Sequence, residues 1–245
     1  MRTANPALND STFGSIVRPG AARMTIQGTI NKSAILLGLV SLTALFTWNK
    51  VMTQPASAMP WMIGGALGGF ILGLITCFKK DWAAATAPLY ALCEGLFLGA
   101  ISGLYELKFH GIVLQAAMLT FGTLFALLAA YRSGLIRATE NFKLGVTAAT
   151  GGIALVYLAS WILGMFGVHI PFIHESGLMG IAFSAFVVVV AALNLVLDFD
   201  FIEQGAEVGA PKYLEWYAAF GLLVTLVWLY IEILRLLSKL QSRRD

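Results

Sequence analysis

Hydrophobic and polar positions divide the chain into seven long apolar segments separated by short polar breaks. Each segment has roughly the 20 mainly apolar residues that a helix needs to cross about 30 Å of hydrocarbon. The runs are too long and alternate too little to be strands of a membrane barrel. We therefore predict an all-α integral membrane protein with seven transmembrane helices, at about residues 33–52, 58–78, 82–105, 111–131, 144–168, 176–199 and 216–238.

Composition supports a membrane protein and divides the chain into three parts. Hydrophobic residues make up 58% of the sequence and charged residues 12%, with a mean hydropathy of +0.80, whereas a soluble domain has about 25% charged residues. We expect a disordered, polar cytoplasmic tail over residues 1–30, the membrane domain over 31–240 and a short basic tail over 241–245. A dispersed net charge of +3 gives no reason to expect a nucleic-acid partner.

Lysine and arginine are distributed unevenly between the predicted loops. Lys50 and Lys108 are the basic residues of one set of loops, and the tail and loops of the other set contain ten. Because cytoplasmic loops carry the excess of basic residues, we expect a cell inner membrane protein with a cytoplasmic amino terminus. The ten are Arg2, Arg18, Arg23, Lys32, Lys79, Lys80, Arg132, Arg137, Lys143 and Lys212.

Basic residues after the last apolar segment leave two alternatives for its path. Arg235, Lys239, Arg243 and Arg244 lie on the far side of the membrane if this segment crosses completely. A re-entrant segment that turns back is the other possibility. We favour the full crossing, because the segment is long enough and contains no proline.

Glycines recur at four-residue spacing in the second segment. Small residues one helical turn apart let another helix approach closely in a membrane. Contact within the bundle is favoured over a dimer face for this set and for Gly145, Gly151 and Gly152 in the fifth segment. The glycines of the second segment are Gly64, Gly65, Gly68, Gly69 and Gly73.

Acidic residues within the apolar segments are the strongest functional signal. Glu94 lies in the middle of the third segment, and Asp198 and Asp200 lie near the end of the sixth. Ionisable groups at this depth are costly and usually face a cavity. Asp198 and Asp200 differ by about 200° around a helix, and Asp200 shares a face with the acids that follow it, so we expect Asp200 to face the interior and Asp198 to turn away. Alternatively, the sixth segment ends here and all these acids are solvated.

The seventh segment has a polar face of its own. Thr225, Glu232 and Lys239 are spaced by seven residues, and Arg235 lies one turn from Glu232. A Glu232–Arg235 pair at the rim of the membrane would contribute little. Because Glu232 lies within an apolar run, we expect it to reach toward the interior instead.

Three stretches resemble the Bax inhibitor family, also called the transmembrane Bax-inhibitor-motif family. They are "LDFDFIEQ" at 197–204, "AAFGLLVTLVWLYIEILRLL" at 218–237 and "YALCEGLFLGAISG" at 90–103. The resemblance covers about residues 25–240 and implies a bundle in which a central helix is surrounded by the others. It also implies that the chain is a bacterial-type member of the family and acts as a pH-sensitive calcium leak. In that family, aspartates of the sixth and seventh spans share a proton and close the path on the cytosolic side.

Residues of this chain can be assigned to that pair with one departure. The sixth-span aspartate maps onto Asp200, or alternatively onto Asp198, while Thr225 occupies the place of the seventh-span aspartate. Glu232, about 10 Å further along the helix, is the nearest acid on that face. Two neighbouring carboxyl groups share one proton near neutral pH, and Asp200 has Asp198, Glu203 and Glu94 as possible partners.

The leading hypothesis is a pH-sensitive leak for calcium or another cation, gated by Asp200, Asp198, Glu94, Glu232 and Thr225. The alternative is a non-conducting regulator that binds a membrane protease or a stress-response partner. An intramembrane aspartyl protease is disfavoured, because the GxGD-type context is absent, and no enzymatic activity is expected. Cys77 and Cys93 have no metal-site spacing, so we expect no cofactor or resident metal.

Overall fold

The computed structural model describes residues 22–167 and 177–243. Nearly all of these residues are helical, and no strand occurs in the described part of the chain. Seven of the helices are long and apolar enough to cross a membrane, which confirms the predicted fold class. They are α1 (Ile26–Thr53), α2 (Ala58–Phe78), α3 (Ala83–Lys108), α4 (Ile112–Arg132), α5 (Glu140–Met165), α7 (Leu178–Glu207) and α8 (Leu214–Ser242), with two short 3-10 helices, η2 (Pro55–Ser57) and η3 (Lys80–Trp82).

Helix ends differ from the sequence prediction where polar residues find partners inside the protein. α1 begins at Ile26, before the predicted start, because Thr25 caps it by accepting a hydrogen bond from the N–H of Gly28. Thr25 also donates its N–H and its hydroxyl to Glu215 of α8, each at 3.0 Å, and Lys32 pairs with the same carboxylate. These contacts join the start of α1 to the start of α8.

Most of the predicted tail, residues 1–21, lies outside the described residues, as do residues 244–245. The described end of the tail is ordered against the connection between α7 and α8. The N–H of Met24 donates to the carbonyl of Ala210 at 2.7 Å, and the N–H of Lys212 donates to the carbonyl of Ala22 at 3.0 Å. This segment therefore holds the α7–α8 connection in place.

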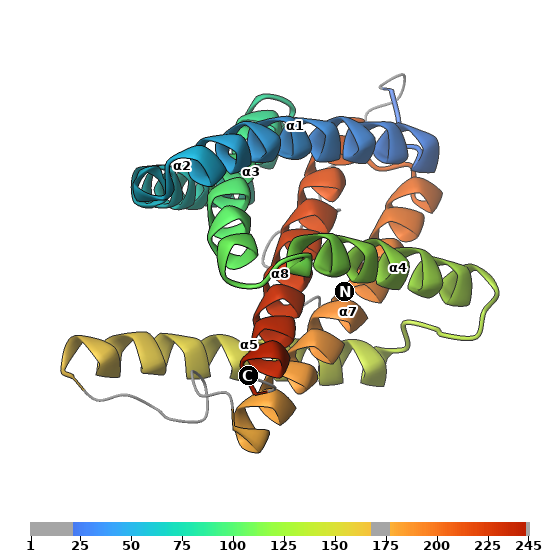
Figure 1. Cartoon of the computed structure of the whole chain (residues 1–245). Helices are drawn as coiled ribbons and strands as arrows, with labels where there is room; N and C mark the ends of the chain where they lie inside the picture. The colour runs from blue at the N-terminus through green and yellow to red at the C-terminus, as the bar shows by residue number, and fades with distance from the viewer. Residues whose placement is uncertain (1–21, 168–176, 244–245) are drawn as a thin grey trace.

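α8 is the central helix of the fold. It contacts α1, α3, α4 and α7 and is the most deeply buried of the seven spans. Figure 1 shows α8 running through the middle of the molecule with α7 beside it and with α1 and α4 crossing it. α8 is also one uninterrupted helix from Leu214 to Ser242, so the seventh span does not turn back within its length.

Glycines of α2 bring that helix close to α3. A Cβ at Gly65 would lie 2.7 Å from backbone atoms of Cys93 and Phe97, and a Cβ at Gly69 would lie 2.7 Å from Oε1 of Glu94. Gly68 and Gly73 face Cys93 and Tyr90 of α3. At Gly64 nothing in the described part of the chain lies within 4 Å, so this glycine is not part of the α2–α3 contact.

A second set of glycines lies on α3 itself and faces α1. Gly95, Gly99 and Gly103 are four residues apart, and a Cβ at Gly99 would lie 2.1 Å from both the carbonyl oxygen of Ala44 and the hydroxyl of Thr47. Sequence reasoning missed this set, although its spacing is the same as that of the α2 glycines. α1, α2 and α3 consequently pack with backbones in close contact.

The glycines of α5 behave differently. A Cβ at Gly145, Gly151 or Gly152 would have no described atom within 4 Å. The prediction that these glycines pack within the bundle is therefore wrong, because their face of α5 points away from the other described helices.

Gly99→Ala tests the close approach of α1 and α3. Its added methyl group collides with backbone and hydroxyl oxygens, and overpacking of this kind lowers the free energy of unfolding by typically 1–3 kcal/mol. The matched control is Gly122→Ala on α4, where the methyl group meets open space and the effect is between neutral and a gain of about 1 kcal/mol. Thermal unfolding in detergent compares the two variants, and equal stability of both would contradict the packing.

Candidate functional site

Asp198 is the most deeply buried acid of the candidate set, with 0% of its surface exposed. It lies on α7 one turn after Asn194, which is also buried and donates a hydrogen bond to the hydroxyl of Thr150 on α5 at 2.9 Å. Two residues after Asp198, Asp200 forms an ion pair with Lys143 of α5 at 3.0 Å. The antiparallel register of α5 and α7 therefore brackets Asp198 between two polar contacts.

The neighbouring part of α8 contributes Thr225. α7 and α8 form an antiparallel hairpin, with Lys239 donating to the carbonyl of Gly180 and the hydroxyl of Ser184 at its far end. This register places Asp198 level with the turn Gly221–Thr225 of α8. Thr225 is buried and donates to the carbonyl of Gly221 at 3.3 Å. Buried polar groups from α7 and α8 thus occupy one layer of the molecule.

Asp200 does not occupy the interior position that the sequence predicted for it. Its side chain is 16% exposed, pairs with Lys143 and accepts a hydrogen bond from Gln204 at 2.6 Å. The following acid, Glu203, is exposed and accepts a hydrogen bond from the hydroxyl of Tyr131 at the end of α4. The face of α7 that carries Asp200 and Glu203 therefore lies at the edge of the bundle. Asp198 rather than Asp200 faces the interior.

Glu94 lies in a different part of the molecule. Its carboxylate faces Gly69 of α2 and forms a hydrogen bond with Tyr90, one turn earlier on α3. Asp198, by contrast, lies on α7 beside α5 and α8. The structure therefore places Glu94 at the α2–α3 interface and does not bring it together with Asp198.

Glu232 is buried with partners of opposite charge and with a tyrosine. It accepts hydrogen bonds from Arg235 at 2.9 Å and from the hydroxyl of Tyr157 on α5 at 3.0 Å. Arg235 also donates to that hydroxyl at 2.6 Å and lies over the tyrosine ring. Glu232 follows Thr225 by seven residues, or about 10 Å of helical rise, so it forms a separate cluster rather than the carboxyl partner of Asp198.

Three α5 residues that make these contacts were missed as site residues. Lys143, Thr150 and Tyr157 are spaced by seven residues, which places them on one face of α5. They reach Asp200, Asn194 and Glu232 respectively. A heptad of polar residues in an apolar span was the signal that pointed to them. Lys143 is one of the basic residues that the loop-charge pattern places in a cytoplasmic loop.

The chemistry of this layer is that of oxygen ligands. Asp198, Asn194, Thr150 and Thr225 carry carboxylate, amide and hydroxyl oxygens, which hard cations prefer. No group of three or more histidine, cysteine, aspartate or glutamate side chains that is suited to hold a metal occurs among the described residues.

Comparison with known proteins gives one match. No curated protein and no solved structure matches the chain. The family model described as Bax inhibitor 1 like matches residues 5–242, nearly the whole sequence. With its seven apolar helices, the chain is a multi-pass membrane protein that belongs to the Bax inhibitor 1 like family.

Proposed function

We propose that this protein is a pH-sensitive leak for cations, calcium foremost, and that protonation of Asp198 closes it. The observation that carries the proposal is the complete burial of Asp198 on α7, the helix that contacts both α5 and α8. Ionisable side chains within a transmembrane helix are costly to bury and usually mark an ion or proton path. Asp198 therefore replaces Asp200 as the leading gating residue.

The same layer provides a route for a cation. Calcium takes six to eight oxygen ligands in stable sites, and the carboxylate, amide and hydroxyl oxygens around Asp198 are fewer and less charged. A cation in this layer is therefore held briefly and retains water molecules. Weak contact of this kind suits passage, because an ion must also leave.

α5 is the element best placed to move. It is the least buried of the seven spans, and its polar contacts to the bundle include those of Lys143, Thr150 and Tyr157. A small apolar cluster of Ile153, Val187 and Val190 completes the interface. Few buried apolar contacts make local opening cheap, so α5 can separate from α7 while α1, α2 and α3 stay packed.

The gating step follows from the charge of Asp198. While this carboxyl group is protonated, it is neutral and the layer packs without water. Loss of the proton creates a negative charge at a completely buried position. Water and a cation entering between α5 and α7 relieve that charge, which favours an open arrangement. The leak consequently rises as pH rises.

Several helix ends lie together at one end of the bundle. They are the amino-terminal ends of α1 and α5 and the carboxyl-terminal ends of α4 and α7, together with the basic loops assigned to the cytoplasm. Asp198 is closer to this end and the Glu232–Arg235 cluster is closer to the other. We place the gate on the cytoplasmic side of the inner membrane. The outer half of the path then passes the Glu232 cluster, where Arg235 compensates the acid.

Asp198→Asn tests the gating residue directly. A permanently neutral side chain at this position keeps the layer closed, so we expect a low calcium leak that no longer changes with pH. Flux into proteoliposomes containing a calcium indicator, measured over a series of pH values, gives the result. The matched control is Asp81→Asn at an exposed position of η3, which keeps the wild-type response, as does Glu94→Gln at the α2–α3 interface. A pH response that persists in Asp198→Asn would contradict the assignment of Asp198 as the gating residue.

Lys143→Met tests whether the pair with Asp200 holds α5 closed. Removal of the lysine leaves a mostly buried carboxylate without its cation, which costs about 1–3 kcal/mol and shifts the equilibrium between closed and open forms by roughly fivefold to a hundredfold. We expect a raised leak at every pH, measured in the same flux assay. The variant Lys143→Met/Asp200→Asn removes both charges and brings the leak back toward wild type. A leak that is equally high in the single and double variants would contradict the role of the pair.

A non-conducting regulator is the second candidate, and one observation favours it. The α5 glycines Gly145, Gly151 and Gly152 point away from the described helices, and small residues of this kind permit close contact with another transmembrane helix. Co-purification of a stoichiometric membrane partner, together with absence of calcium flux from the purified protein, would support this function over the leak.

A further inference from the structure

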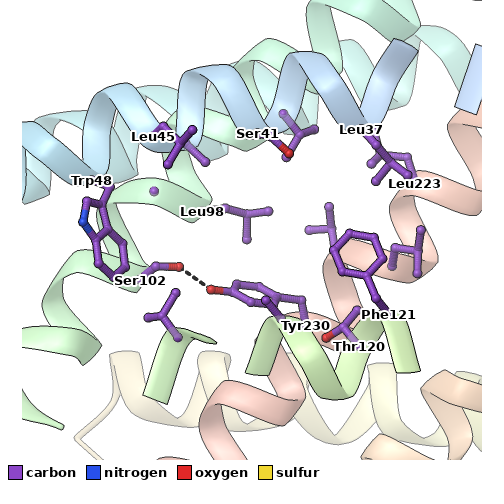
Figure 2. Close-up of a pocket in the computed structure, with 17 residues that line it drawn as sticks. Leu37, Ser41, Leu45, Trp48, Leu98, Ser102, Thr120, Phe121, Leu223 and Tyr230 are labelled. Carbon is purple, nitrogen blue, oxygen red and sulfur yellow. Dashed lines mark hydrogen bonds between the residues drawn. The ribbon is translucent and has the colours of Figure 1, made fainter. Parts of the chain in front are cut away.

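Two adjoining cavities form one groove between α1 and α4. The first, of about 300 Å³, lies between α1, α3, α4 and α8, and Figure 2 shows it lined by side chains of these helices. The second, of about 320 Å³, lies between α1, α4, α7 and α8. Leu37, Phe121 and Leu226 line both cavities, so the two spaces meet along the same three helices.

The mouth of the groove faces the hydrocarbon of the membrane. Ile30 and Phe125, which line the second cavity, are 53% and 64% exposed, and Leu45 of the first is 61% exposed. The floor is buried and includes Leu124 and Phe199. Large exposed apolar side chains in a membrane-spanning protein contact lipid, so a lipid chain can enter the groove from the side.

Three hydroxyl groups of the first cavity have partners within the protein. The hydroxyls of Ser102 and Tyr230 form a hydrogen bond with each other at 2.7 Å, as Figure 2 shows. The hydroxyl of Thr120 donates to the carbonyl of Ala116 at 2.8 Å. Most of the residues that line this cavity are apolar, so this part of the groove suits a hydrocarbon chain rather than a polar ligand.

The second cavity ends at a polar rim that contains a cation. Tyr131, Arg132 and Glu203 line it there, and Tyr131 donates to Glu203. Arg132 is the exposed last residue of α4. Within residues 22–167 and 177–243 it forms no salt bridge. Arginine binds phosphate well through its planar set of donors.

The length of the second cavity matches half a bilayer. On α4 it runs from Phe121 to Arg132, a helical rise of about 17 Å. Half of the hydrocarbon layer is about 15 Å thick, which is the depth that one acyl chain occupies below its headgroup.

We infer that the groove between α1 and α4 binds one acyl chain of an anionic phospholipid, whose phosphate contacts Arg132. The lipid comes from the leaflet at which α4 ends. Phe199 and Leu226 line the groove and adjoin Asp198 and Thr225 in the sequence. A bound chain therefore supports the same turns of α7 and α8 that carry the buried polar layer.

Native mass spectrometry of the full chain tests this inference. The protein is taken from mixed vesicles of phosphatidylglycerol and phosphatidylcholine into mild detergent, and the retained lipid is identified. We expect one phosphatidylglycerol per chain in the wild type. Ala34→Trp fills the second cavity from α1 and reduces retention several-fold. The matched Ala126→Trp, at an exposed position of α4 outside the groove, leaves retention unchanged.

Arg132→Gln tests the contact with the lipid headgroup separately from the contact with the acyl chain. We expect this variant to retain a lipid while losing the preference for phosphatidylglycerol over phosphatidylcholine. Equal retention in wild type and Ala34→Trp, retention of several lipids without preference, or a second copy of the chain in place of lipid would each overturn the inference. These readouts do not depend on calcium flux, so failure of the lipid site can be distinguished from failure of the proposed leak.

Discussion

Polar side chains inside a hydrocarbon layer must find their partners within the protein, because lipid offers none. This constraint organises the half of the molecule built from α5, α7 and α8. Lys143, Thr150 and Tyr157 each reach a polar group on a neighbouring helix, and these contacts place α5. Asp198 lies inside the same arrangement, completely buried. In the proposed leak, its charge determines whether α5 stays in contact.

The other half of the molecule is held by a different interaction. Glycines of α2 and α3 let three helices approach until backbone atoms touch, and this packing cannot loosen gradually without losing contact altogether. α8 contacts both α1 and α3 on this side and α7 on the other. α8 thus joins the closely packed α1–α3 unit to α7, against which the lightly buried α5 packs. In the proposed mechanism, α5 moves while the rest stays in place.

Most of the fold follows from hydropathy, whereas the site depends on pairing that hydropathy does not describe. The seven spans were predictable because each one is a long apolar run. Helical geometry favours Asp200 over Asp198 for the interior position, because Asp200 shares a face with Glu203 and Glu207. In the structure that face contacts Lys143 and Tyr131 at the edge of the bundle. Asn194, one turn before Asp198, carried the better signal, since a buried amide also needs a partner. The partners themselves lie on α5, and no spacing within α7 reveals which face of α5 will meet it.

The central claim is that the charge of Asp198 controls the contact between α5 and the bundle. Spin labels at the exposed positions Leu155 of α5 and Leu119 of α4, introduced after Cys77 and Cys93 are replaced, report the separation of these helices by double electron–electron resonance in nanodiscs. The account predicts a distance distribution that shifts as pH rises in otherwise native protein and stays at its low-pH form in Asp198→Asn. A distribution that is independent of pH while the leak changes, or a shift that persists in Asp198→Asn, would contradict it.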